Sequence, residues 1–169
     1  LMRFLSYISI MTKNLDQLGL RSVVDNYDLF FIDLWGVVHN GIKLHDHSIE
    51  VLDNLSKSNK DFILLTNAPR PNENVINFLK KMGLEKHFQN VFTSGEAAKK
   101  YLISELENQK FFHIGPPRDF DLFENIKKQN VLNINDADYL LCTGLFDDHE
   151  NDLNYYKKIL SNHISKKMI

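Results

Sequence analysis

Reactive side chains stand directly after two short apolar runs of the sequence. Asp33 follows the run 29–32, and Thr66 with Asn67 follows the run 62–65. Such runs are typical of buried strands in a parallel sheet, and ligands bind beyond the carboxyl ends of those strands. A carboxylate in that position acts either as a nucleophile and cation ligand or as the cap of its own turn. Which of the two roles applies to Asp33 depends on the strands and helices that surround it.

The surrounding sequence alternates between strand-like and helix-like segments. Helical periodicity begins at Asp46 and again at Asn72, where it ends at Gly83. This alternation predicts an α/β fold with an open parallel sheet, and it places Asp33 and Thr66 at the same sheet edge. The expected strands are 29–34, 62–65, 91–93, 111–114 and 139–143, and the further expected helices are 15–24, 96–106, 120–128 and 152–160.

The composition is that of an ordinary globular protein and excludes several classes. The 169 residues are 43% apolar and 25% charged, with a net charge of -2 and no long run of like charge. A chain of this length provides about one domain, or one domain and an incomplete second. Without a basic face we expect no nucleic-acid partner. The apolar stretch 1–11 is too short for a signal peptide and lacks a cleavage site, so we expect neither export nor a membrane partner.

Three further polar features have ordinary structural interpretations. The only cysteine, Cys142, excludes an internal disulfide and fits a reducing cytoplasm, and its apolar neighbours predict a place in the core. The polar run 146–150 is expected to start a helix, since acidic groups are favoured at a helix N-terminus. Arg70 either contacts an anionic substrate or is an exposed residue before a helix.

Three segments resemble a known family. Segment 31–41, FIDLWGVVHNG, resembles motif one of the haloacid dehalogenase (HAD) superfamily, and segment 64–70, LLTNAPR, resembles motif two. The match is to subclass IIA, which includes nucleotide, pyridoxal-phosphate and sugar phosphatases with a large α/β cap. Segment 92–98, FTSGEAA, is similar to the sequence that leads into that cap. The resemblance extends from about residue 28 to the end of the chain.

This resemblance implies a HAD-like parallel Rossmannoid sheet with an inserted α/β cap. It divides the chain into an N-terminal extension and helix at 1–25, the N-terminal part of the core at 26–92 and the cap at 93–169. The family's third motif, a lysine, and its fourth, an acidic pair, follow the cap, and no segment of the chain matches them. We therefore expect an incomplete core with one exposed sheet edge, truncated after the cap.

The implied chemistry is magnesium-dependent hydrolysis of a phosphomonoester on a small phosphorylated metabolite in the cytoplasm. By the resemblance, Asp33 attacks phosphorus to form an aspartyl-phosphate and also binds Mg²⁺. The backbone carbonyl of Trp35 is a second metal ligand, and Thr66 and Asn67 bind the phosphate. The alternative is a non-catalytic remnant, or half of a split protein that needs a separate C-terminal fragment. The other partner that we consider is a second copy of the chain, in a homo-oligomer.

One departure from the family pattern affects the chemistry directly. The family places a second aspartate two residues after the nucleophile, where it acts as general acid and base, and Trp35 occupies that position here. General acid–base catalysis is worth about 10²–10⁴-fold in rate. His39 is the nearest substitute, and its alternative is a turn histidine bonded to backbone. The lysines of the last segment are expected to be solvated: Lys157, Lys158, Lys166 and Lys167.

Overall fold

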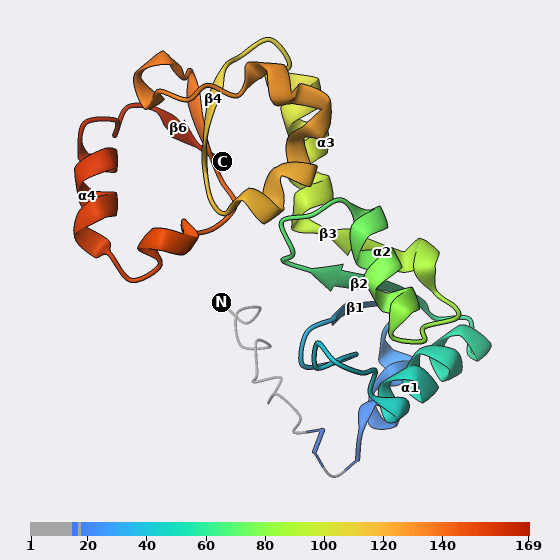
Figure 1. Cartoon of the computed structure of the whole chain (residues 1–169). Coiled ribbons are helices and arrows are strands. Elements are labelled where there is room, and N and C mark those ends of the chain that lie inside the picture. Colours follow the sequence, from blue (N-terminus) through green and yellow to red (C-terminus); the bar gives the residue numbers. More distant parts are fainter. Residues whose placement is uncertain (1–14, 17) are drawn as a thin grey trace, which may run out of the picture.

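The chain folds around two separate parallel sheets. A computed structural model describes residues 15, 16 and 18–169, and the remainder of the predicted N-terminal extension lies outside the described residues. Figure 1 shows the two sheets in two lobes, which we call the first and the second lobe. The prediction of an α/β fold with parallel sheets is confirmed. The first sheet has the order β1 (Leu29–Asp33), β2 (Asp61–Thr66), β3 (Val91–Thr93), and the second has the order β4 (Phe111–Ile114), β5 (Tyr139–Cys142), β6 (Lys167–Met168).

The first lobe packs two amphipathic helices on its sheet. Helix α1 (Asp46–Lys57) buries Leu52 and Leu55, and helix α2 (Asn72–Lys81) buries Val75 and Leu79. Because successive strand residues point to opposite faces, only one face of the sheet joins this core. The residues of that core also include Leu34, Val38, Phe62, Leu64, Leu84 and Val91.

The opposite face of the first sheet is apolar and exposed. Leu29 and Phe31 on β1 and Leu65 on β2 are all exposed. On its other side, β1 has no strand partner in the described part of the chain. Parallel sheets are normally covered on both faces, so within the described residues the first sheet has one uncovered face and one unpaired edge. The predicted truncation of the core stays a prediction.

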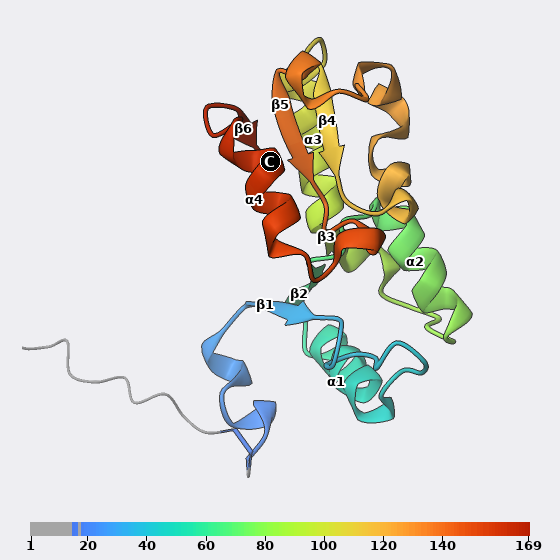
Figure 2. The same ribbon diagram turned by 60° about the vertical axis from the view of Figure 1, so that its left-hand side comes forward.

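The second lobe has an aromatic core. Helix α3 (Ser94–Leu106) leaves β3 and runs into this lobe, as Figures 1 and 2 show. The ring of Phe111 contacts those of Phe123 and Tyr139 at centroid distances of 5.1 and 5.7 Å. Helix α4 (Leu153–Ser161) buries none of its residues. The core residues are Leu102, Leu106, Phe111, Leu122, Phe123, Ile126, Tyr139 and Leu141.

Several local predictions were wrong. Segment 120–128 is not an α-helix, because it lies in a 3₁₀ segment, Pro117–Gln129, with non-helical backbone at Phe123 and Ile126. Phe123 and Ile126 are nevertheless both buried in the core of the second lobe. The described part of 15–24 likewise forms 3₁₀ turns rather than one α-helix, with Leu20–Ser22 and Val24–Asn26 as the turns.

Polar residues at the carboxyl end of the chain also depart from expectation. Cys142 is exposed and not part of the core, because it ends β5. Its Sγ lies 3.6 Å from the Gly144 carbonyl oxygen, and desolvation raises the pKa of the thiol. Lys166 donates to the Ala137 carbonyl, and the Lys167 ammonium lies 4.7 Å from the centre of the Tyr101 ring. These two lysines therefore hold β6 in place and are not simply solvated, whereas Lys157 and Lys158 are exposed on α4.

Charged groups join the two lobes beside the end of β2. The Arg70 guanidinium lies 3.5 Å from the Asp121 carboxylate and 3.9 Å from the Asp119 carboxylate. The Asp119 side chain is only 7% exposed, and the Asn74 amide donates to Asp121. A carboxylate this buried requires a compensating charge, so Arg70 stabilises the contact between the lobes.

Replacing Arg70 by Met should destabilise the fold by about 1–2 kcal/mol, because Asp119 is left buried without its cation. Urea unfolding followed by circular dichroism measures the change. Arg118→Met is the matched control, since Arg118 forms an exposed ion pair with Asp147 in the same segment. An equal loss in both variants would show that Arg70 has no special role.

His113 should make the stability depend on pH. Its ring is buried, Nε2 lies 2.8 Å from Thr143 Oγ1, and desolvation lowers the pKa of His113 from 6.5 to about 4. Between these values the unfolded chain binds a proton that the folded chain does not, so stability falls as pH falls. The loss from pH 7 to pH 4 is about 3 kcal/mol.

Unfolding measured across this range should show a shallower pH dependence for His113→Gln than for the wild type. His47→Gln serves as the control, because the His47 side chain is 97% exposed. If both variants keep the slope of the wild type, burial of His113 does not control acid stability.

Candidate active site

Asp33 ends β1 at the edge where the strands of the first sheet finish. Its carboxylate is exposed, and Oδ1 accepts a 2.8 Å hydrogen bond from the Leu34 amide. No other hydrogen bond to this carboxylate comes from the described part of the chain. The side chain therefore caps its turn with one oxygen, and this leaves the other oxygen available to a ligand.

A tight turn directs the chain after Asp33. The carbonyl of Leu34 accepts hydrogen bonds from the amides of Val38 at 2.9 Å and His39 at 3.1 Å. The Gly36 amide donates to the His39 carbonyl at 2.8 Å, and Gly36 has a φ of 76° that favours glycine. These bonds fix the position of Trp35 at the tip of the turn.

Trp35 places an indole beside the strand end, where the family has a carboxylate. The side chain is 65% exposed, and its ring meets that of His39 edge-on at 5.6 Å. It also covers Gly41, because a Cβ atom added there would lie 2.5 Å from Trp35 Cη2 and Cζ3. A side chain at position 41 would displace the indole, and the φ of 88° separately favours glycine there.

His39 is 5% exposed and lies under this turn. Its Nδ1 accepts a 3.0 Å hydrogen bond from the Gly41 amide, and its ring meets Phe78 at 5.7 Å. Burial and then the charge of His45 lower the pKa of His39, whereas the Asp33 carboxylate raises it. The backbone bond is the contact expected of a turn histidine, and a lowered pKa reduces the protonated fraction available for acid catalysis.

Thr66 and Asn67 lie at the end of β2, beside the strand that carries Asp33. The parallel register pairs Asp33 with Leu65, so Thr66 is one residue beyond Asp33 along the sheet edge. Thr66 is half-buried and Asn67 is exposed, and neither side chain hydrogen-bonds to another described residue. The fold therefore brings the carboxylate and the two candidate phosphate-binding residues to one edge.

A buried network behind this edge was not anticipated. Thr93 Oγ1 accepts from the Glu96 amide at 2.8 Å and lies 2.6 Å from the Arg70 carbonyl, to which it donates. Asn72 Oδ1 accepts from the Thr93 amide, and Glu96 Oε2 accepts from the Asn72 amide. Thr-x-x-Glu is a capping-box pattern, which was the available sequence signal. The network fixes the loop that follows Thr66.

The described residues offer a magnesium ion few protein ligands. They contain no cluster of three His, Cys, Asp or Glu side chains placed to hold a metal. Magnesium prefers oxygen ligands and commonly keeps several waters, so the Asp33 carboxylate and the Trp35 carbonyl are a chemically suitable but minimal set.

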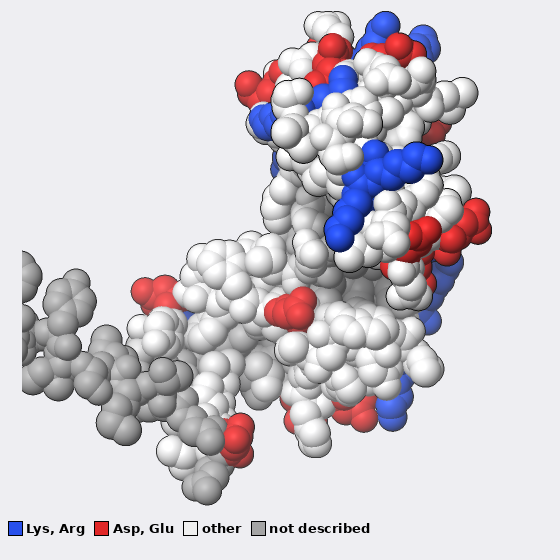
Figure 3. Space-filling model, turned by 90° about the vertical axis from the view of Figure 1, so that its left-hand side faces the viewer, with Lys and Arg blue, Asp and Glu red and all other residues white. Residues whose placement is uncertain are grey.

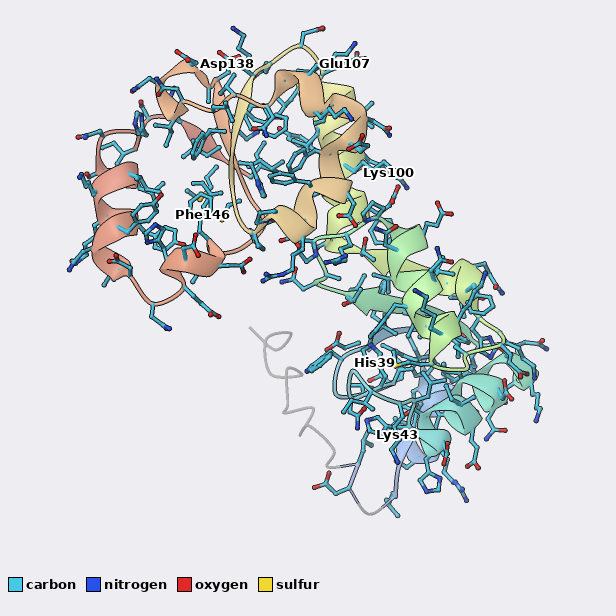
Figure 4. The ribbon with its side chains drawn as sticks, in the orientation of Figure 1. His39, Lys43, Lys100, Glu107, Asp138 and Phe146 are labelled. Carbon is cyan, nitrogen blue, oxygen red and sulfur yellow. The ribbon has the colours of Figure 1, made fainter. Side chains whose placement is uncertain are left out.

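Two other candidate segments do not belong to this site. Arg70 is held by Asp119 and Asp121, as described above. Segment 146–150 lies in the second lobe, and Figure 4 shows Phe146 well apart from His39. There Asp147 pairs with Arg118, and a 3₁₀ turn, Asp147–His149, precedes α4.

The chain belongs to the haloacid dehalogenase-like hydrolase family, whose sequence model matches residues 30–128. No curated protein matches it significantly. The relationship to subclass IIA proposed from the sequence is supported by the solved structures that follow. Within the described residues, no helix has the length and apolar character needed to cross a membrane.

Solved structures of this family share the fold. A haloacid dehalogenase-like hydrolase from Brucella suis 1330 is 32% identical, with a TM-score of 0.72 over 92% of this chain and 57% of its own. A 4-nitrophenylphosphatase from Thermotoga maritima is 26% identical, with a TM-score of 0.57, and the match covers 71% of this chain and 46% of that protein. A glycerol phosphate phosphatase from Mycobacterium tuberculosis, solved with magnesium, is 21% identical, with a TM-score of 0.54. The match covers 73% of this chain and 38% of that protein. The chain thus spans 57% of the length of the Brucella suis protein and less than half the length of the other two.

Gly41→Ala should both destabilise the turn and displace Trp35. The positive φ costs about 1–2 kcal/mol for a residue with a side chain, and the new methyl collides with the indole. Trp35 is the only tryptophan, so its fluorescence maximum reports the displacement directly.

Gly83→Ala is the matched control. Gly83 has a φ of 95°, but a Cβ atom there has no neighbour within 4 Å. It should lose a similar amount of stability without a change in the emission maximum. An unchanged spectrum in folded Gly41→Ala would show that the indole does not rest on Gly41.

Proposed function

We propose that the protein is a magnesium-dependent phosphomonoesterase that acts on a small phosphorylated metabolite through an aspartyl-phosphate on Asp33. One observation carries this proposal: an exposed carboxylate at the carboxyl end of β1 lies beside Thr66 at the end of β2. Membership of the hydrolase family supports the reaction class. A related 4-nitrophenylphosphatase and a related glycerol phosphate phosphatase support the substrate class.

Each residue has a defined role in this reaction. A carboxylate oxygen of Asp33 attacks phosphorus, the ester bond breaks, and the alcohol leaves with the bonding electrons and takes up a proton. Water then attacks the phosphorus of the acyl phosphate, which releases inorganic phosphate and restores the carboxylate. Thr66 and Asn67 donate hydrogen bonds to the phosphoryl oxygens. His39 is the candidate for proton transfer.

Magnesium would be held by the Asp33 carboxylate and the Trp35 carbonyl, and it would neutralise the charge of two approaching anions. The face of the first lobe shown in Figure 3 is mostly uncharged, with few basic groups that could neutralise a phosphate. A cation is therefore needed for a phosphate group to approach Asp33.

The two lobes suggest a division of labour. We propose that residues 26–92 form the N-terminal part of the core, which carries the chemistry, and that residues 93–169 form the α/β cap, which contacts the organic part of the substrate. Separate sheets and separate apolar clusters support this division. A cytoplasmic location is consistent with the single cysteine.

A second candidate is a non-catalytic remnant, or one half of an enzyme completed by a separate C-terminal fragment or by a second copy. The exposed apolar face formed by Leu29, Phe31 and Leu65 favours it, since such a face promotes association. Magnesium-dependent activity that appears only after another polypeptide is added would distinguish this candidate from a self-sufficient enzyme.

The test of the main proposal is release of 4-nitrophenol from 4-nitrophenyl phosphate by the purified chain with magnesium. Asp33→Asn should lower turnover by at least about a thousandfold, because an amide does not form the covalent intermediate. Asp61→Asn, an exposed aspartate at the opposite end of the sheet, should leave turnover unchanged. Equal turnover in Asp33→Asn and the wild type would refute the role of Asp33.

A further inference from the structure

An exposed indole stands where the candidate site needs contact with the non-phosphoryl part of a substrate. Trp35 follows Asp33 by two residues, on the turn that leaves the sheet edge. An aromatic ring gains free energy when its apolar area is buried against a ligand. The side chain of Trp35 is 65% exposed, so most of this area is available to a ligand.

The indole is held on one side and open on the other. Its six-membered ring lies against Gly41, and its edge contact with His39 adds a second constraint. His39 is in turn fixed by the Gly41 amide and by Phe78, whose ring lies 5.7 Å away. A surface that is ordered before binding loses little conformational freedom when a ligand arrives, so this arrangement favours recognition.

Further exposed apolar side chains lie on the same turn and on the neighbouring strand. Val37, on the same turn, and Leu65, the strand partner of Asp33, are both exposed. The ring of His39 contacts the indole, and the Asp33 charge also acts on that ring. Because Trp35 follows Asp33 by two residues on the same turn, a group attached to a phosphate at Asp33 would lie near the indole.

We propose that Trp35 determines specificity by stacking on a planar aromatic group in the organic part of the phosphate ester. The preferred substrate class is then an aromatic phosphate ester rather than a sugar or glycerol phosphate. Offset stacking adds to the burial of apolar area, whereas a polyhydroxylated group would leave its hydroxyls facing an apolar surface. This inference rests on the proposed phosphoryl site at Asp33.

The test compares two ligands of similar size and apolar character that differ in planarity. Phenylphosphonate and cyclohexylphosphonate are titrated by calorimetry into the full chain with magnesium, with methylphosphonate as a probe of the phosphoryl site alone. Phenylphosphonate should bind about fivefold more tightly than cyclohexylphosphonate. The ratio should fall to about one in Trp35→Leu and be kept in Trp35→Phe.

Each outcome has a distinct meaning. A ratio near one in the wild type, or a ratio unchanged in Trp35→Leu, overturns the stacking role while the phosphoryl site stands. Failure of all three phosphonates to bind refutes the phosphoryl site, and the inference falls with it. A thermal melt of each variant confirms folding, and quenching of Trp35 fluorescence by phenylphosphonate in the wild type provides an independent readout.

Discussion

The candidate site depends on one constraint, the parallel register between β1 and β2. In a parallel ladder the carboxyl ends of adjacent strands meet at one edge. Here the pairing of Asp33 with Leu65 puts Thr66 immediately beyond the carboxylate. A shift of register by one residue would turn every side chain of β1 to the other face, which would bury Asp33 and expose Ile32. The apolar packing of that one face against α1 and α2 therefore sets the position of the candidate site as well as the fold.

The edge also needs support from behind, because loops after strands are otherwise free to move. Thr93, Asn72 and Glu96 satisfy one another and the backbone of the loop that follows Thr66, and Gly95 lets α3 begin directly against the Arg70 backbone. A Cβ at Gly95 would lie 2.2 Å from the Arg70 amide nitrogen. The start of α3 thus supports both lobes: it fixes the end of β2 that carries the candidate residues Thr66 and Asn67, and it leads the chain into the second lobe.

Sequence reasoning predicted the strand ends well because buried parallel strands are short, apolar and followed by polar residues, as at Asp33 and Thr66. It was less successful where tertiary packing overrides local preference. Segment 120–128 has the apolar spacing of an α-helix, but its aromatic contacts with β4 select 3₁₀ geometry. The interlobe pairing of Arg70 with Asp119 joins residues far apart in sequence, and no local pattern encodes such a contact. The exposure of Cys142 has the same origin, since the position of a strand end depends on its partners.

The candidate site differs from a site with two carboxylates, because Trp35 provides an aromatic surface at the position of the second aspartate in the family pattern. The central claim is nonetheless that Asp33 is the nucleophile. Acid quenching of the chain during turnover of 4-nitrophenyl phosphate with magnesium, followed by proteolysis and mass spectrometry, tests it most directly. The account predicts a phosphoryl group on the peptide that contains Asp33 and none in Asp33→Asn. Turnover without such a peptide, or a phosphoryl group on another residue, would contradict it.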